Sequence, residues 1–153
     1  MIQKIMFVAS SGGHLEEISQ LKRIAKQYDN SLVTEKNEFE VRSFGNRQYF
    51  VPQINRKELL FLPKFIRLFF QANKLLKKEK PDLIITTGAL ISVPFCILEK
   101  KKKGKVVYIE SFARVHEPSL TGKILHRYAD VFIVQWEDML NYYPDAILGG
   151  GIF

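Results

Sequence analysis

The sequence has 153 residues, of which 46% are hydrophobic and 25% are charged, and its formal net charge is +7. This composition excludes a disordered polymer, a collagen-like repeat and a coiled coil. At this length we expect one domain over residues 1–153, so a cleft between two complete lobes would need a second chain.

Short β-rich runs alternate with helical ones, which predicts an α/β fold, a Rossmann-like parallel sheet with helices on both faces. Strands are expected at residues 5–9, 31–35, 49–52, 82–87, 105–109 and 131–135. Helices are expected at residues 14–27, 62–80, 91–101 and 119–129. Ligands of such sheets lie outside the carboxyl ends of the strands. We therefore expect the functional residues in the loops 10–14, 87–90 and 110–119.

The loop Ser10-Ser11-Gly12-Gly13-His14 follows the first expected strand and opens the first helix. Its glycines allow close approach to a ligand, and the free amides of a helix N-terminus attract an anion. The loop matches neither the dinucleotide fingerprint nor a P-loop, so a tight turn without a ligand is the alternative. The positive helix end favours a neutral His14 that could accept a proton, and a structural histidine is the alternative.

The basic residues gather in two places, with a net charge of +6 in residues 56–80 and +5 in residues 100–105. This pattern indicates a polyanion or an anionic membrane surface as the partner of one side. Neither patch has the interleaved aromatic residues of a nucleic-acid-binding module, so we expect no nucleic acid.

The helix expected at residues 62–80 carries two apolar stripes. We expect the first to cover the sheet, and it consists of Leu62, Phe65, Ile66, Phe69 and Leu76. The second stripe lies beside basic residues, a combination that suits the surface of an anionic membrane. This expected membrane-contact set consists of the apolar Phe61, Leu68 and Leu75 and the basic Lys64, Arg67, Lys74 and Lys78. Each cation near such a surface is worth about 1 kcal/mol. A helix that is simply buried on two sides is the alternative.

The only cysteine, Cys96, lies in an apolar run, where we expect a small buried thiol. A single cysteine excludes a disulfide framework and a multi-cysteine metal site, and we expect no metal or other cofactor in this chain. Residues 1–9 show no cleavage signal, and no stretch approaches the roughly 20 apolar residues of a spanning helix. We therefore expect an intracellular protein that is not inserted in a membrane.

Glu110 directly follows an expected strand and so faces the ligand crevice. It could orient a sugar hydroxyl, act as a base or pair with Arg114. Ser119 or Thr121 would cap the next helix. The C-terminal stretch is apolar and glycine-rich, which fits a last edge strand or, as we expect, a contact with a partner chain through Gly149, Gly150, Gly151, Ile152 and Phe153.

Several short motifs acquire meaning from their order along the chain: Ser11-Gly12-Gly13-His14, Thr87-Gly88, Glu110-Ser111, Thr121-Gly122-Lys123, Ala129-Asp130, Val134-Gln135-Trp136 and Tyr143-Pro144-Asp145-Ala146. Together they resemble the Alg-fourteen family of oligosaccharide and capsular polysaccharide biosynthesis proteins, over essentially the whole chain. A more distant similarity, through the glycine loop, Thr87-Gly88 and Glu110, is to the acceptor half of the peptidoglycan lipid-intermediate N-acetylglucosaminyltransferase.

The resemblance implies the N-terminal half of a split GT-B glycosyltransferase for capsule or exopolysaccharide synthesis, inactive alone and peripheral on the inner face of the cell membrane. This half would bind a lipid-linked acceptor, and an Alg-thirteen-like chain would hold the UDP-sugar.

The implied reaction is an inverting transfer, in which the acceptor hydroxyl attacks the anomeric carbon and His14 or Glu110 removes its proton. Gly12 and Gly13 would bind a diphosphate, and the acceptor side would be lined by Ser11, Thr87, Gly88 and Arg114. The alternatives are a non-catalytic membrane recruitment module and an independent nucleotide-binding α/β enzyme.

Overall fold

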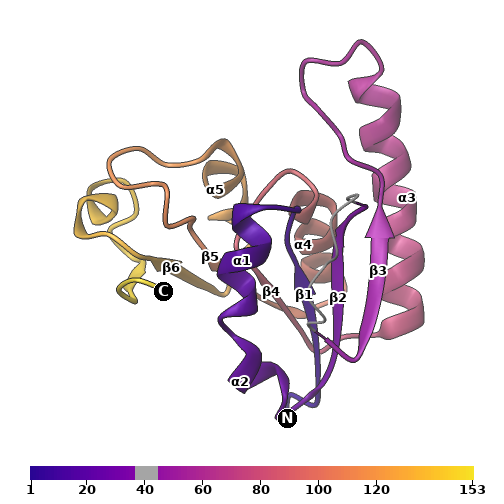
Figure 1. Ribbon diagram of the computed structural model, residues 1–153, viewed down its shortest axis with the longest axis horizontal. Helices are drawn as coiled ribbons and strands as arrows, with labels where there is room; N and C mark the ends of the chain where they lie inside the picture. The colour runs from indigo at the N-terminus through magenta and orange to yellow at the C-terminus, as the bar shows by residue number, and fades with distance from the viewer. Residues whose placement is uncertain (37–44) are drawn as a thin grey trace.

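The computed structural model describes residues 1–36 and 45–153, and within them seven parallel strands form one sheet in the order β3-β2-β1-β4-β5-β6-β7 (Figure 1). The strands are β1 Lys4–Val8, β2 Asp29–Glu35, β3 Arg47–Val51, β4 Leu83–Thr86, β5 Lys105–Ile109, β6 Val131–Val134 and β7 Ile147–Leu148. All six predicted strands are present, with ends shifted by at most two residues. The short β7 confirms that part of the C-terminal stretch is an edge strand beside β6.

The helices connect these strands and cover both faces of the sheet. They are α1 Gly13–Ser19, α2 Lys22–Ala25, α3 Phe61–Glu79, α4 Ser92–Lys101, α5 Leu120–Leu125 and the 3₁₀ helix η1 Glu137–Asn141. The helix predicted at residues 14–27 is broken in two, because the amides of Gln20 and Leu21 form the tighter i→i−3 bonds. The helix predicted at residues 119–129 ends early, at Leu125.

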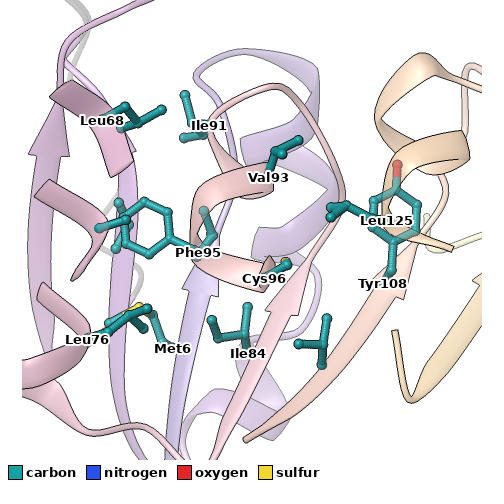
Figure 2. Close-up of a cluster of buried hydrophobic side chains, with 14 of the residues drawn as sticks. Met6, Leu68, Leu76, Ile84, Ile91, Val93, Phe95, Cys96, Tyr108 and Leu125 are labelled. Atoms are coloured by element: carbon teal, nitrogen blue, oxygen red, sulfur yellow. The ribbon is translucent and has the colours of Figure 1, made fainter. Parts of the chain in front are cut away.

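Alternate residues of β1 point to opposite faces of the sheet, and each face has its own core. Ile5 and Phe7 pack with Ile18 beneath α1 and α2. Met6 and Val8 belong to the larger core beneath α3 and α4, part of which Figure 2 shows. The predicted buried thiol is confirmed there, since Cys96 is fully buried and burial raises its pKa.

The face of helix α3 that meets the sheet matches the predicted one only in part, since Leu76 is buried and Phe65 packs against the core as expected. Its buried residues are Leu68, Ala72, Leu76 and Glu79. Leu62 and Ile66, which we expected on the sheet, are 63% and 50% exposed. The prediction failed because the polar side of the helix includes Glu79, which pairs with the Arg47 guanidinium and accepts a hydrogen bond from the Tyr49 hydroxyl at the sheet. The helix is therefore rotated toward that pair.

The rotation also corrects the predicted membrane-contact set. Leu68 is only 1% exposed, so it lies in the core and cannot contact a membrane. Phe61 and Leu75 are partly buried against the core. Lys64 pairs with Glu58. Three members of the set are exposed along the helix, Arg67, Lys74 and Lys78.

A different group of apolar side chains is exposed, which we call the α3 ridge: Leu59, Leu60, Leu62, Ile66 and Phe70. The first turns of α3 and the loop before them extend beyond the carboxyl edge of the sheet (Figure 1). Lys78, predicted beside the membrane stripe, instead holds its ammonium 4.8 Å from the centre of the Tyr49 ring. Within the described residues no helix is long and apolar enough to cross a bilayer.

Candidate functional site

The order of the sheet reverses between β1 and β4, because β2 and β3 lie on one side of β1 and β4 to β7 on the other. The carboxyl ends of the strands at such a switch point form the usual ligand crevice. Two predicted loops meet there. His14 Nδ1 lies 2.8 Å from the carbonyl oxygen of Thr87, and the Thr87 hydroxyl donates to the carbonyl oxygen of His14, also at 2.8 Å.

This pair of bonds determines which nitrogen of His14 can do chemistry. A carbonyl oxygen only accepts, so Nδ1 carries the hydrogen and Nε2 of the neutral ring keeps its lone pair. His14 also lines a cavity of about 260 Å³ at the switch point. The imidazole is therefore held by its backbone partner, and no hydrogen bond to its Nε2 is found among residues 1–36 and 45–153.

Gly88 is required beside His14. Its φ is +103°, and a Cβ there would lie 2.9 Å from the Tyr108 hydroxyl oxygen and 3.5 Å from Cε1 of His14. Thr87 and Gly88 are both buried and do not line the cavity. Both were predicted to contact the acceptor, whereas in the structure they lie against His14 and hold it in place.

The loop of Ser11, Gly12 and Gly13 before His14 lies beside the cavity and does not form its wall. Gly12 has a φ of +84° and precedes α1 without a side-chain cap. The Ser11 hydroxyl donates to Glu35 at 3.3 Å, and burial raises the pKa of that carboxyl. Gly13 is exposed next to His14. Neither glycine nor Ser11 is among the residues that line the cavity.

The wall of the cavity combines cations and hydroxyls. It is formed by His14, Arg56, Ala89, Ser111, Ala113, Arg114, Ser119, Leu120 and Thr121. Two guanidinium groups beside three hydroxyls suit a ligand with anionic oxygens and further hydroxyl groups. Among the predicted site residues, the structure brings His14 and Arg114 together here.

The sequence reasoning missed Arg56 and the cavity-lining role of Ser119 and Thr121. Arg56 follows the carboxyl end of β3, so the rule that selected the other three loops would have selected its loop too. From the sequence, Arg56 is recognisable only as part of the basic segment 56–80.

Glu110 does not face the cavity. Glu110 is only 1% exposed. Its Oε1 accepts hydrogen bonds from the Tyr108 hydroxyl at 3.2 Å and from the Ser111 amide at 3.1 Å. Oε2 accepts from the amide and the hydroxyl of Ser119, at 3.2 and 3.1 Å. The alternative of a pair with Arg114 is wrong, because these donors occupy the carboxylate. Glu110 fixes the loop that carries cavity residues.

Ser119 is the N-cap of α5, as predicted, since its hydroxyl accepts from the Gly122 amide at 2.8 Å. This cap brings the first turn of α5 against the Glu110 carboxylate. A Cβ at Gly122 would lie only 2.1 Å from Oε2 of Glu110. A side chain at this position is therefore incompatible with the Glu110 network.

A second buried carboxylate holds the same loop from α1. Glu17 Oε1 accepts from the Ser111 hydroxyl at 3.0 Å and from the Phe112 amide at 2.8 Å. Burial raises the pKa of Glu17, and these two bonds act against the rise. We call residues 110–119 the pocket loop. Both carboxylates point into it and leave the open side of the cavity to the arginines.

Comparison with known proteins shows the family of this chain. Residues 51–152 match the family described as "Oligosaccharide biosynthesis protein Alg14 like". The chain belongs to this family. The resemblance drawn from the sequence motifs is thereby confirmed.

Relatives of this Alg14-like chain match either nearly all of it or a part of it. The mouse (Mus musculus) protein "UDP-N-acetylglucosamine transferase subunit ALG14" is 27% identical over 97% of this chain and 82% of its own length. A second relative, from Finegoldia magna, is "UDP-N-acetylglucosamine--N-acetylmuramyl-(pentapeptide) pyrophosphoryl-undecaprenol N-acetylglucosamine transferase". It is 34% identical over 61% of this chain, which corresponds to 24% of its own length.

The fold is also found in solved structures of longer proteins. MurG of Acinetobacter baumannii superposes with a TM-score of 0.69 and 18% identity over 86% of this chain. The chain spans 41% of that protein's length, so it corresponds to one part of it. The predicted fold, a Rossmann-like domain of the GT-B type, is confirmed by this likeness.

Proposed function

We propose that this chain is the acceptor-binding subunit of a two-chain UDP-N-acetylglucosamine-dependent glycosyltransferase of polysaccharide synthesis. The observation that carries the proposal is the cavity at the switch point, where His14, Arg56 and Arg114 meet. The names of the mouse relative, a transferase subunit, and of the Finegoldia transferase support the reaction class. The partner we expect is an Alg-thirteen-like chain that holds the UDP-sugar.

The acceptor in this proposal is a lipid-linked sugar diphosphate. Arg56 and Arg114 are suited to its phosphate oxygens, because guanidinium groups bind such oxygens through two parallel hydrogen bonds. The Finegoldia relative is named for a pyrophosphoryl-undecaprenol substrate, which supports this class of acceptor.

The chemical step is an inverting displacement. An acceptor hydroxyl attacks the anomeric carbon of the donor sugar, the bond from that carbon to the phosphate oxygen breaks, and UDP leaves. His14 Nε2 accepts the hydroxyl proton as the new bond forms. Of the two predicted bases His14 fits this role, because Glu110 is buried and bonded to four donors. Positioned bases of this kind contribute about 10²–10⁴-fold to a rate.

The α3 ridge is the proposed membrane contact, in place of the stripe predicted from the sequence. Five exposed large apolar side chains are adjacent along the chain to Arg67 and Lys74. An apolar surface beside cations suits the headgroup region of an anionic bilayer. The loop that carries Arg56 into the cavity continues into Leu59 and Leu60 of the ridge. A lipid tail could therefore leave the cavity directly toward the membrane.

The partner contact is proposed at the other end of the sheet. Strand β7 is an edge strand, and its residues Ile147 and Leu148 are exposed. Unpaired strand edges are ready to pair with another chain. We propose that β7 and the predicted contact residues, Gly149 to Phe153, form the surface that meets the Alg-thirteen-like chain.

The first experiment measures diphosphate binding by the purified chain, with inorganic pyrophosphate and farnesyl diphosphate as probes in isothermal titration. Arg56→Ala and Arg114→Ala should each weaken binding by about 10- to 100-fold, because each loses a charge-assisted hydrogen bond of about 1.5–3 kcal/mol. Lys57→Ala is the matched control, since Lys57 is exposed on the same loop and does not line the cavity. Equal binding by the wild type and both arginine variants would contradict the proposed acceptor site.

The second experiment measures transfer from UDP-N-acetylglucosamine to membrane acceptors, with this chain and the Alg-thirteen-like chain together and apart. Transfer should require both chains. Turnover by this chain alone would instead support an independent enzyme. Full transfer by the pair carrying His14→Ala would support a recruitment module.

A further inference from the structure

Gln135 follows β6 directly and is 5% exposed. Its Nε2 donates to the carbonyl oxygen of Glu110 at 2.9 Å, and its Oε1 accepts from the amide of Ile152, also at 2.9 Å. A carbonyl only accepts and an amide N–H only donates, so the two partners fix the orientation of the side-chain amide. One side chain thus joins the start of the pocket loop to the C-terminal segment.

Aromatic contacts join the same two segments a second time. Trp136 Nε1 donates to the carbonyl oxygen of Phe112 at 2.7 Å, and the two rings lie 4.9 Å apart. On its other side Phe112 meets the ring of Phe153 edge-on, with the centroids 5.4 Å apart. A Cβ at Gly151 would lie 3.3 Å from the Phe112 ring, so the segment follows the ring closely. The C-terminal segment therefore packs directly against the pocket loop.

The pocket loop depends on such contacts because it has no regular secondary structure. Loops of this kind keep one conformation only where side chains hold them. Glu17 and Glu110 hold the loop from the side of the sheet. The opposite side is held by Gln135, Trp136 and the C-terminal segment. These contacts act on residues 110–112, and the amide of Arg114 donates to the carbonyl oxygen of Ser111 at 2.9 Å. Ser111 and Arg114 both line the cavity.

We propose that Gln135 is a positioning residue that makes residues 149–153 a brace for the pocket loop. The inference rests on the proposed function, which takes the cavity as the acceptor site and the C-terminal segment as the partner contact. A partner bound to that segment then also stabilises the cavity wall. The donor-binding chain would in this way improve acceptor binding without touching the acceptor.

Hydrogen exchange on the full chain, without partner or sugar nucleotide, tests the brace directly. Gln135→Met keeps the length of the side chain and removes both hydrogen bonds. Amides of residues 111–119 should then exchange about tenfold faster, as expected for the loss of about 1.4 kcal/mol of local stability. Amides of β1 and β4 should exchange as in the wild type. Gln20→Met, at an exposed position, is the matched control and should change neither region.

Phe153→Ala gives a second test that does not risk the core, because Phe153 is 66% exposed. It removes the ring that meets Phe112 and should speed exchange in residues 111–119 several-fold. If both variants loosen residues 147–153 and leave residues 111–119 unchanged, the brace is wrong. Such a result leaves the proposed function standing, because that function is judged by the pyrophosphate titration of the arginine variants.

A kinetic measurement on the assembled pair separates positioning from general damage. Gln135→Met should raise the KM for the lipid acceptor several-fold and leave the KM for UDP-N-acetylglucosamine unchanged. An equal rise in both KM values, or a loss of kcat alone, would overturn the assignment of Gln135 as a positioning residue for this cavity.

Discussion

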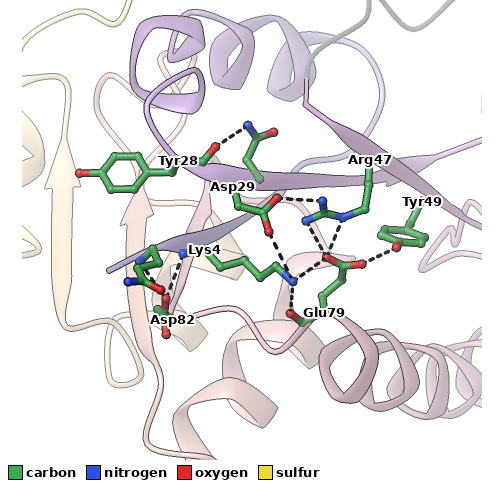
Figure 3. Close-up of polar contacts among 9 residues, drawn as sticks. Lys4, Tyr28, Asp29, Arg47, Tyr49, Glu79 and Asp82 are labelled. Carbon is green, nitrogen blue, oxygen red and sulfur yellow. Dashed lines mark hydrogen bonds and ion pairs between the residues drawn. The ribbon is translucent and has the colours of Figure 1, made fainter. Parts of the chain in front are cut away.

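The two edges of the sheet use charge in opposite ways. At the amino edge the buried Glu79 carboxylate accepts from Tyr49 and, at 3.0 Å, from Nε of Arg47, which also pairs with Asp29 at 2.8 Å (Figure 3). Lys4 lies 3.7 Å from Glu79 and 3.5 Å from Asp29. Burial alone would raise the pKa of Glu79, but the bonds from Tyr49 and Arg47 hold it below its usual value. The charges at this edge cancel.

At the carboxyl edge the carboxylates and the cations are kept apart. Glu17 and Glu110 point inward and accept from hydroxyls and amides of the pocket loop. Arg56 and Arg114 line the open cavity, and within residues 1–36 and 45–153 neither makes an ion pair. Balanced charges join distant strands and stabilise the fold, whereas cations without counter-charges in a cavity are free for an anionic ligand. Variants of Glu79 and variants of the cavity residues His14, Arg56 and Arg114 should therefore affect different measurements.

The largest expected effect is at the carboxyl edge. His14→Ala removes the proposed base and should lower transfer by the assembled pair about 10²–10⁴-fold. The thermal midpoint should change little, because His14 is half-buried and its Nδ1 makes one bond to a loop carbonyl. His116→Ala, at an exposed histidine, is the control and should keep full transfer. If the two-chain complex carrying His14→Ala kept normal turnover, His14 would not be the base.

Next comes the amino edge, where Glu79→Ala leaves Arg47 without its buried partner. Arg47 is 36% exposed and keeps Asp29 as a partner, so the loss of two charge-assisted hydrogen bonds should cost about 3 kcal/mol of unfolding free energy, measurable by urea denaturation. Pyrophosphate binding should be unchanged. Asp29→Ala, at a half-exposed partner of the same arginine, should cost less than about 1 kcal/mol. A loss of pyrophosphate binding with Glu79→Ala, or equal costs at the two sites, would contradict the division between the edges.

The pH dependence of the Glu79 effect has a definite sign. The folded-state pKa of Glu79 is lowered. Its ionised form therefore stabilises the fold fully above the usual carboxyl value of about 4.3, and this contribution is lost as the pH falls through the lower folded value. The difference between wild type and Glu79→Ala should be constant near neutral pH and shrink below about pH 4. A difference that grows on acidification would mean that the pKa is raised instead.

A smaller effect is expected for Glu110→Gln, which keeps the shape of the side chain and weakens its acceptor bonds. The expected cost is about 1–3 kcal/mol in unfolding free energy, with a higher KM for the acceptor. Glu117→Gln, at an exposed site nearby, should change neither quantity. A collapse of kcat with stability and KM preserved would instead make Glu110 the base.

The smallest effect concerns the α3 ridge. Ile66→Asp should reduce binding to phosphatidylglycerol vesicles about tenfold, since burial of such a side chain is worth about 1.5–3 kcal/mol. Leu68→Ala should leave vesicle binding unchanged and lower stability by about 2–5 kcal/mol, because Leu68 lies in the core. If Leu68→Ala weakened vesicle binding and Ile66→Asp did not, the membrane contact would lie on the stripe predicted from the sequence, Phe61, Leu68 and Leu75.

The sequence was sufficient to predict the strands and the loops at their carboxyl ends, because these depend on local patterns. Alternating β and helical runs define the sheet, and its carboxyl edge then selects the loops. The face of α3 could not be predicted in this way. Its orientation depends on Glu79 and Arg47, which are 32 positions apart in the sequence. Periodicity along one helix contains no information on a partner in a distant strand.

The site was predictable in outline for a similar reason. The loop positions of His14 and Arg114 follow from the strands, whereas the direction of a side chain depends on its neighbours. Glu110 was predicted to face the crevice because it follows β5, but Tyr108 and Ser119 supply donors on the inner side. Arg56 could have been predicted by the same rule, because its loop follows the carboxyl end of β3.

Complete enclosure of Cys96 has a practical consequence. Because the native thiol is inaccessible and its ionisation is suppressed, it will not react with maleimides while the protein is folded. Single cysteines can therefore be introduced at Phe70 or Phe153 and labelled with environment-sensitive dyes in an otherwise unaltered background. One dye would report contact with lipid, and the other would report arrival of the second subunit.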